Sequence, residues 1–140
     1  MSLRKKEISL QTRAVEEVQD ITAEVNAAIR DLGLRDGVVL LVCPHTTAAL
    51  TVNESADPDV RKDFQQAFSQ MIPKIPFAHT EGNSPAHVRA AILGPSLVLP
   101  VEDGRLALGT WQGLYFCEFD GPRRRRIWVY VVVEGKAGQS

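Results

Sequence analysis

The sequence predicts an α+β domain in which a mainly antiparallel β-sheet is combined with about three helices. Apolar runs predict strands, and segments with helical spacing and helix-capping residues lie between them. Near the C-terminus, turn sequences at Asp103-Gly104 and at 120–123 each lie between two predicted strands, which favours antiparallel pairing. The predicted order of elements is β-α-β-α-α-β-β-β-β.

The length and composition are typical of one folded domain. The chain has 140 residues, 44% of them hydrophobic and 24% charged, which is ordinary for a globular domain with a core of its own. We therefore expect a single domain over residues 1–140, in which only the last residues, GKAGQS, form a short tail.

The charge and the first residues argue against several functional classes. The net charge is −1, so no overall field attracts the chain to nucleic acid or to a membrane surface. The start, MSLRKKEISL, has no apolar stretch typical of a signal peptide, and no apolar run approaches the roughly 18 residues of a membrane span. We expect a cytoplasmic protein without nucleic-acid or membrane partners. Cys43 and Cys117 lie in apolar runs, and we expect buried reduced thiols rather than a disulfide.

The first half contains a strand, a helix and a second strand. Alternation in residues 6–15 predicts the first strand. Helical spacing of apolar residues in 15–33 predicts a helix that ends at Gly33. The continuous run from Val38 to Cys43 predicts a strand buried on both faces, and Pro44 ends its pairing.

Two further helices are predicted before the C-terminal strands. Asp57 and Pro58 suit the start of a helix that Pro73 and Pro76 terminate. A shorter helix follows Asn83, with Ser84 as the cap and Gly94 at the end; its predicted inward residues are Val88, Ala91 and Ile92. The remaining strands cover SLVLPV, RLALG, WQGLYFCEF and RRIWVYVVV.

The three histidines are the main candidates for a functional site. His45 follows the second predicted strand, His79 lies in a Pro-rich loop, and His87 lies in the first turn of the third helix. Each is therefore next to a turn or an element end. Neutral imidazole is a good ligand for zinc and related divalent ions, and a helix N-terminus favours the neutral form of His87. Three protein ligands leave a fourth position open, which is the catalytic pattern. The alternative is three unrelated polar histidines.

Polar residues near the histidines extend this hypothesis. Thr46 and Thr47 follow His45, and their hydroxyls suit phosphate binding or orientation of a ligand. Glu54, next to Asn53, is either a general base or the start of the turn before the second helix. The segment EGNS offers backbone N–H groups to an anion, although an ordinary helix cap is the commoner role.

Two further features have competing interpretations. The run from Arg123 to Arg126 alternates between two faces of a strand, and we expect a solvated edge that resists aggregation; phosphate binding and nucleic-acid binding are the alternatives. Trp111, followed by Gln112, suits either stacking on a substrate ring or packing in the core.

Five sequence blocks resemble the YjbQ-like family. They run in order from about Cys43 to Arg126, over more than half of the chain, and read PHTTAALTVNE, ADPDVRKDF, HTEGNSPAH, ILGPSLVLPVEDGRLALGTWQ and EFDGPRRRR. Members of this family have been linked to a secondary thiamine-phosphate synthase activity. One departure from the family pattern is the short segment between His79 and His87, which contains Pro85.

The resemblance implies a fold, an assembly and a site. The fold would be α+β with a compact antiparallel sheet, assembled as a homotrimer. The family's histidines map onto His45, His79 and His87, in a site that would bear a metal. From the imidazole ligands we expect zinc, with magnesium or another divalent ion as the alternative. The family's other site positions map onto Asn53, Glu54, Asn83, residues 109–112 and residues 120–123, in a pocket near a subunit boundary.

Together these features predict a metal-dependent enzyme that acts on a phosphorylated or diphosphorylated small molecule. In this hypothesis Glu54 and Asn53 are catalytic, and the substrate is bound by Thr46, Thr47, Asn83, Ser84, Trp111, Gln112 and Arg123. A trimeric module that binds a small anion or metal without turnover is the first alternative, and a metal-assisted hydrolase is the second.

Overall fold

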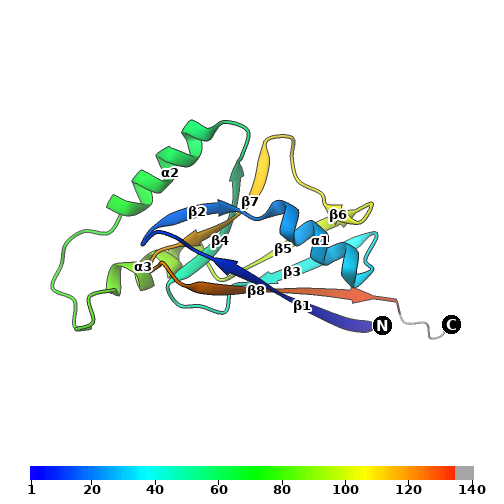
Figure 1. Ribbon diagram of the computed structural model, residues 1–140, viewed down its shortest axis with the longest axis horizontal. Coiled ribbons are helices and arrows are strands. Elements are labelled where there is room, and N and C mark those ends of the chain that lie inside the picture. The colour runs from blue at the N-terminus through cyan, green and yellow to red at the C-terminus, as the bar shows by residue number, and fades with distance from the viewer. Residues whose placement is uncertain (135–140) are drawn as a thin grey trace.

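The structure is a computed structural model that describes residues 1–134, and the predicted tail at 135–140 lies outside the described residues. It contains three helices, α1 (Thr22–Leu32), α2 (Pro58–Gln70) and α3 (Ser84–Leu93). Its strands are β1 (Ser2–Gln11), β2 (Glu17–Asp20), β3 (Gly37–Val42), β4 (Ala48–Glu54), β5 (Ser96–Glu102), β6 (Arg105–Leu106), β7 (Gln112–Glu118) and β8 (Arg124–Val133). Figure 1 shows their arrangement.

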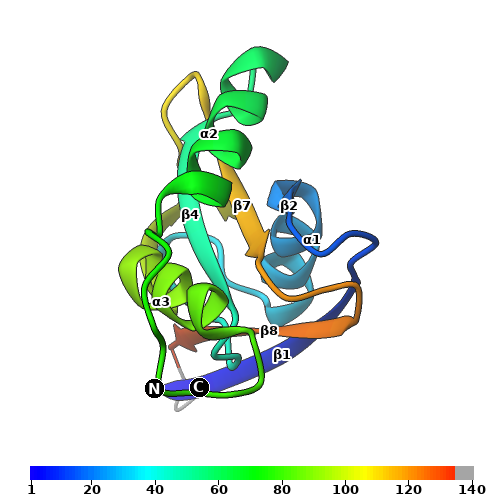
Figure 2. The same ribbon diagram turned by 90° about the vertical axis from the view of Figure 1, so that its left-hand side faces the viewer.

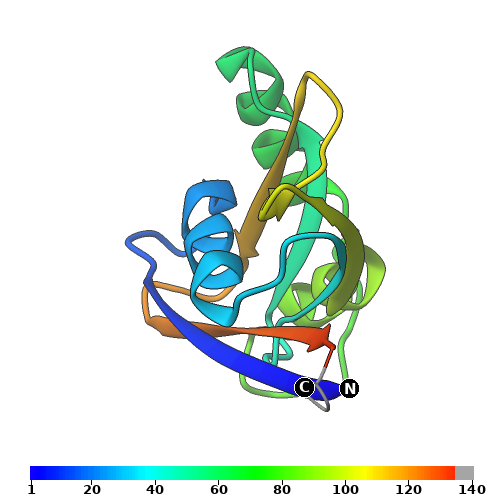
Figure 3. The same cartoon turned by 90° about the vertical axis from the view of Figure 1, so that its right-hand side faces the viewer.

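The strands form two antiparallel sheets, which confirms the predicted α+β class but divides the single predicted sheet into two. The larger sheet has the order β1-β8-β3-β5-β6, and the smaller one has the order β2-β7-β4. The helices α2 and α3 lie along the smaller sheet (Figure 2), and α1 packs on the inner side of the larger one (Figure 3). The main core lies between the sheets and includes residues of α1, β3, β4, β7 and β8.

Several predicted boundaries are confirmed. Gly33 ends α1 in the left-handed conformation, with φ of 83°, and its N–H bonds back to the last turn. The Asp57 side chain accepts a hydrogen bond from the N–H of Asp59, which caps α2. Asp103 and Gly104 both have positive φ and connect β5 to β6 as the predicted hairpin. Both cysteines are buried and free.

Two strands were missed because tertiary pairing decided them. Residues 17–20, assigned to the first helix, form β2 and pair with β7, so α1 starts only at Thr22. The run 48–54, not assigned to any element, forms β4 on the other side of β7. A central strand needs a hydrogen-bonding partner on each side, and this requirement overrides the weak helical spacing of 17–20.

The burial of two predicted surfaces also differs. In β3, Val38 is 56% and Leu40 is 39% exposed, so the prediction of a strand buried on both faces is wrong for the single chain. The doubly buried strand is β7, which lies between the main core and the helices α2 and α3. In α3 the buried residues are Ala86, Arg89 and Ala90, whereas Val88, Ala91 and Ile92, predicted to face inward, are exposed.

The outer face of the larger sheet carries several exposed apolar side chains and is not covered by a helix of the described chain (Figures 1 and 3). Leu40 of β3 lies opposite Val98 of β5 and Tyr130 of β8, and Val132 of β8 lies opposite Leu3 of β1. Val98, Leu3 and Val132 are 66%, 67% and 47% exposed. A contiguous exposed apolar face of this kind is typical of an interaction surface.

Candidate functional site

His45 lies where the chain leaves β3 and passes the start of β8. Pro44 follows β3, so the chain leaves the sheet there. The Nε2 atom of His45 accepts a hydrogen bond of 2.9 Å from the backbone N–H of Arg126. Burial, together with the positive charge of nearby Arg125, lowers the pKa of His45 below its ordinary value. His45 is therefore held as a neutral imidazole near pH 7.

His79 and His87 lie close together at the start of α3. Their ring centroids are 5.8 Å apart, and the rings are nearly perpendicular. The Nδ1 atom of His79 is 3.3 Å from the hydroxyl of Ser84, and its Nε2 atom is 3.3 Å from a carboxylate oxygen of Glu81. Asn83, rather than the predicted Ser84, is the N-cap residue of α3. Ser84 instead contacts His79.

A polar pocket of about 460 Å³ brings together half of the predicted site residues. It lies between the chain after β3, the start of α3 and the connection from β7 to β8. The lining residues are Pro44, His45, Thr46, Thr47, Glu81, Asn83, His87, Asp120, Arg123 and Arg125. We refer to this space as the His45–His87 pocket. Of the predicted metal and substrate ligands, it contains His45, His87, Thr46, Thr47, Asn83 and Arg123.

An apolar extension adjoins the pocket. It has a volume of about 240 Å³ and shares His45, Thr46 and His87 with the His45–His87 pocket. Its other lining residues are Ala48, Ala90, Ala91 and Pro95. The two imidazoles thus stand between a polar space with two arginines and a space lined by small apolar groups.

Asn83 has an unpaired acceptor in this region. Its Nδ2 atom donates a hydrogen bond of 3.0 Å to a carboxylate oxygen of Asp120, which sets the orientation of the amide. The Oδ1 atom is buried and has no partner among the described residues. Because leaving such an acceptor unpaired costs about 1–3 kcal/mol, Oδ1 is suited to accept a hydrogen bond from a ligand or a water molecule.

The three histidines do not fit a three-imidazole metal centre as they are arranged. Each metal-ligating nitrogen must offer a free lone pair. The Nε2 lone pair of His45 is used by the N–H of Arg126, and both nitrogens of His79 face polar neighbours. Within residues 1–134, no group of three or more His, Cys, Asp or Glu side chains is arranged to hold a metal ion. The metal site stays a prediction.

The predicted residues Asn53, Glu54, Trp111 and Gln112 lie elsewhere in the chain. They are at the far end of the pairing of β4 with β7, where Glu54 is opposite Gln112, whereas the pocket is near the Ala48 end. Six residues of strand separate the two ends, or roughly 20 Å. Within one chain these four residues do not reach the His45–His87 pocket.

Local contacts explain their positions. Glu54 accepts hydrogen bonds from the N–H groups of Ala56 and Asp57, so its carboxylate organises the turn before α2, as the alternative interpretation proposed. Gln112 accepts a hydrogen bond from the N–H of Gly109. Trp111 is 64% exposed, so the alternative prediction that Trp111 packs in the core is wrong for the single chain.

Sequence reasoning missed the most deeply buried charges beside the pocket. Arg125 is 2% exposed and forms an ion pair with Glu118, which is fully buried. Arg124 and Arg126 are exposed, as expected, but Arg125 is buried, and the expectation of an edge strand is wrong because β8 lies between β1 and β3. The strict alternation of a strand was the available signal, because it points every second arginine of the run towards the interior.

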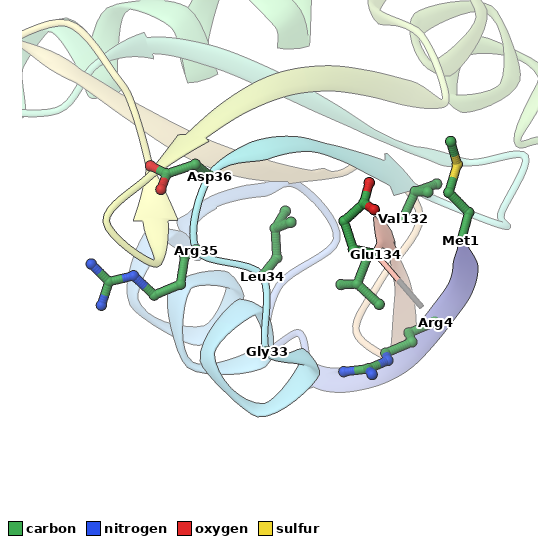
Figure 4. Close-up of a pocket in the computed structure, with 9 residues that line it drawn as sticks. Met1, Arg4, Gly33, Leu34, Arg35, Asp36, Val132 and Glu134 are labelled. Atoms are coloured by element: carbon green, nitrogen blue, oxygen red, sulfur yellow. The ribbon is translucent and has the colours of Figure 1, made fainter. Parts of the chain in front are cut away.

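A separate pocket of about 480 Å³ lies at the opposite end of the larger sheet (Figure 4). It is lined by Met1, Arg4, the residues 33–36 and the residues 132–134. The Arg4 side chain there donates a hydrogen bond of 2.7 Å to the carbonyl oxygen of Leu32 at the end of α1. None of the predicted site residues lines this pocket.

Comparison with known proteins agrees with this fold. Residues 6–134 match the family described as UPF0047 protein YjbQ-like. The chain is 47% identical over 126 residues to UPF0047 protein YugU of Bacillus subtilis, covering 89% of this chain and 96% of that protein. It is 40% identical over 112 residues to UPF0047 protein YjbQ of Salmonella typhimurium, covering 74% and 81%.

Solved structures extend the match to three dimensions. A YjbQ/UPF0047 family protein of Clostridium acetobutylicum superposes with a TM-score of 0.83 at 46% identity, covering 89% of this chain and 97% of that one. A YbjQ-like protein of Sulfolobus solfataricus superposes with a TM-score of 0.87 at 31% identity, covering 95% and 99%. Within residues 1–134, no helix has the length and apolar character needed to cross a membrane. The sequence and the fold together establish that the chain belongs to the YjbQ-like UPF0047 family.

Proposed function

We propose that the chain is an enzyme that binds a small phosphorylated or diphosphorylated molecule in the His45–His87 pocket. The observation that carries the proposal is the convergence of two imidazoles, two threonines, an amide and two arginines on one space of about 460 Å³. Arginine and hydroxyl donors are the groups that recognise phosphate oxygens, and convergent polar groups in a concave site are the usual basis of ligand binding.

The apolar extension supports a ligand with two different ends. A phosphate would occupy the polar space, near Thr47 and the arginines, and an apolar or aromatic ring would occupy the space lined by Ala48, Ala90 and Pro95. The bond between the two parts would then lie beside His45 and His87. In this binding mode the imidazoles would be the proton donors and acceptors next to the bond that changes in a phosphate-releasing reaction.

His87 is the better candidate for proton transfer. Within residues 1–134 no hydrogen bond engages its ring, whereas His45 is bound to Arg126 and His79 to Ser84 and Glu81. An imidazole without a protein partner is free to give a proton to a departing phosphate oxygen or to take one from an attacking group. His45 would orient the ligand.

Thiamine-phosphate synthesis is the candidate reaction to test first. In it, the C–O bond between a pyrimidine methylene and its diphosphate breaks, and pyrophosphate leaves with the electron pair. The ring nitrogen of a thiazole phosphate forms the new C–N bond. A ligand with a diphosphate at one end and an aromatic ring at the other matches the two spaces of the pocket.

The proposal is tested by incubating the full chain with the two thiamine precursors and measuring thiamine phosphate and pyrophosphate. We expect product from the wild-type protein and a loss of about 100-fold or more in His87→Ala, the typical contribution of a positioned acid or base. Val88→Ala, next to His87 on the exposed side of α3, is the matched control. Phosphate binding without product would identify a binding module, and the absence of phosphate binding would refute the proposal.

We also propose that copies of the chain associate as a homotrimer through the outer face of the larger sheet. The support is the row of exposed apolar side chains across β1, β8, β3 and β5. Apolar residues on both sides of a strand are typical of a strand that is covered on both faces.

A further inference from the structure

Arg125 is held on two sides by neighbouring groups. Its Nε atom donates a hydrogen bond of 2.8 Å to Glu118, and its Nη2 atom donates one of 2.8 Å to the hydroxyl of Thr47 and contacts the second Glu118 oxygen. The side chain is 2% exposed. The guanidinium plane is therefore fixed, because its fork of donors is matched by a carboxylate on one edge.

One nitrogen of this guanidinium is left for the pocket. The hydrogen bonds within residues 1–134 use Nε and Nη2, which leaves Nη1 without a protein partner. Arg125 also lines the His45–His87 pocket. Burial and the positive charge of Arg125 both lower the pKa of His45, which lines the same pocket. A buried cation with one unpaired donor thus borders the polar space.

The partner of Arg125 is itself rigidly positioned. Glu118 is fully buried and accepts hydrogen bonds of 2.8 Å from the hydroxyl of Thr12 and of 2.9 Å from the N–H of Asp120. Gly121 packs closely behind it, because a Cβ atom at this position would lie 2.9 Å from both Glu118 Cγ and Thr12 Oγ1. The carboxylate therefore has little freedom to turn away from Arg125.

Arg123, the arginine predicted from the sequence, is much less constrained. Its side chain is 52% exposed. It bonds to the carbonyl oxygen and the carboxylate of Asp120, at 2.9 and 3.2 Å, within its own turn. An exposed arginine that already faces a carboxylate is screened by solvent and offers a weaker, less directed interaction to an anion.

We propose that Arg125, held in place by Glu118, is the residue that recognises the phosphate group of the ligand, through its free Nη1 edge. The inference rests on the proposed function and goes further by assigning the phosphate contact to a buried arginine and a positioning role to Glu118. Buried ion pairs add little net stability compared with apolar packing, so a role in recognition gives a physical reason for this pair beside a pocket.

Binding of inorganic pyrophosphate, measured by titration calorimetry on the full chain, tests the assignment. Arg125→Lys keeps the charge but loses the planar fork, and we expect it to weaken binding by about ten-fold or more, the loss of one charge-assisted hydrogen bond. Arg124→Lys is the matched control, because Arg124 precedes Arg125 on β8 and is exposed. Its affinity should equal that of the wild type, and Arg123→Lys should lose less than Arg125→Lys.

A second measurement starts from the wild-type protein and applies even where Arg125→Lys does not fold. Guanidinium ¹⁵N resonances of the wild-type protein should shift at Arg125 more than at Arg123 when pyrophosphate is added. Glu118→Gln should reduce that shift at Arg125, which a purely structural role of Glu118 in a folded variant would not do. Pyrophosphate binding with unshifted Arg125 resonances would overturn this inference and leave the proposed function intact. No binding by the wild type would overturn both.

Discussion

The Nε2 atom of His45 accepts a hydrogen bond from the backbone N–H of Arg126, across 81 positions of sequence. An accepting Nε2 must carry a lone pair, so the proton of the neutral ring lies on Nδ1. We therefore expect ¹⁵N spectra of histidine-labelled protein to show His45 in the Nδ1–H form and to titrate below the ordinary value of 6.5. An Nε2–H tautomer or a raised titration midpoint would contradict this arrangement.

The lowered pKa of His45 makes stability depend on pH. Its folded value is below its unfolded value, so the unfolded chain binds the proton first as the pH falls. The stability that neutral His45 contributes is fully present above about pH 6.5. It decreases as the pH falls towards the pKa of His45 in the folded protein and is gone below that pKa. His45→Gln keeps an acceptor for Arg126 but does not titrate, so its urea-unfolding free energy should depend less on pH in this window.

Elemental analysis tests the metal prediction. Coordination by His45 through Nε2 requires its ring to leave Arg126. If the three-histidine centre forms, protein purified without a histidine tag should hold about one transition-metal ion per chain, and each of His45→Ala, His79→Ala and His87→Ala should lose it. A metal content well below one ion per chain would refute the centre. Wild-type protein incubated with zinc and then dialysed is the control for loss during purification.

Removal of one partner from the buried pair of Glu118 and Arg125 should destabilise the fold, although the intact pair adds little net stability. Removal of one partner of a buried pair leaves an uncompensated charge and costs about 3–5 kcal/mol. We expect Glu118→Ala to lower the free energy of urea unfolding by an amount of this order. Glu102→Ala, at an exposed glutamate of β5, should change it by less than about 0.5 kcal/mol. Equal effects of the two substitutions would contradict the burial of the pair.

Acid should weaken the same pair. Burial alone would raise the pKa of Glu118. Hydrogen bonds from Arg125, from the N–H of Asp120 and from Thr12, together with the charge of Arg125, outweigh the effect of burial, so the pKa of Glu118 is lowered. The stability contributed by ionised Glu118 is present above the ordinary glutamate pKa of about 4.3. It is lost as the pH falls through the pKa of Glu118 in the folded protein. Acid unfolding of the wild type should therefore be steeper below pH 4.3 than that of Glu118→Gln.

The exposed face of the larger sheet should control assembly. A charge placed among apolar side chains that become buried is strongly unfavourable, so Leu40→Glu or Val98→Glu should convert trimers into monomers. Sedimentation equilibrium measures the change. Ile92→Glu introduces the same charge at a 58% exposed residue of α3, outside the sheet face, and should leave the assembly unchanged. A wild-type protein that is monomeric at all concentrations would contradict the proposed assembly.

The two cysteines should be chemically inert in the folded protein. Burial raises the pKa of Cys43 to about 11 and that of Cys117 to about 12. At pH 8 the reactive thiolate of Cys43 is then only about one part in a thousand. We expect a thiol reagent to modify both cysteines in urea and neither one in buffer. Rapid labelling of the native protein would show that one of them is accessible.

Local signals were sufficient for much of the fold. The cap at Asp57, the left-handed Gly33 and the Asp103-Gly104 turn act over a few residues, and the structure confirms each of them. The placement of the histidines at element ends also followed from local breaks such as Pro44. These features depend on backbone conformations that neighbouring residues determine without help from the rest of the chain.

Tertiary pairing decided what local signals left open. Residues 17–20 fit a helix by spacing, but β7 needed a partner along its edge, and they became β2. The pairing of β4 with β7 puts Glu54 at one end of β4, whereas the pocket lies at the other end. Glu54 is nevertheless only a few positions in the sequence from Thr47, which lines the pocket. Strand geometry converts that short separation into a long distance.

The sequence by itself determined the α+β class, many element boundaries and the types of polar residue that line the His45–His87 pocket, because these depend on local periodicity and side-chain chemistry. Only the tertiary structure decided that His45 and His87 share one pocket and that Arg125, inside a run of four arginines, is the buried one. Contacts between positions as distant as Thr12 and Glu118 set that burial, and no local pattern encodes which distant groups will meet.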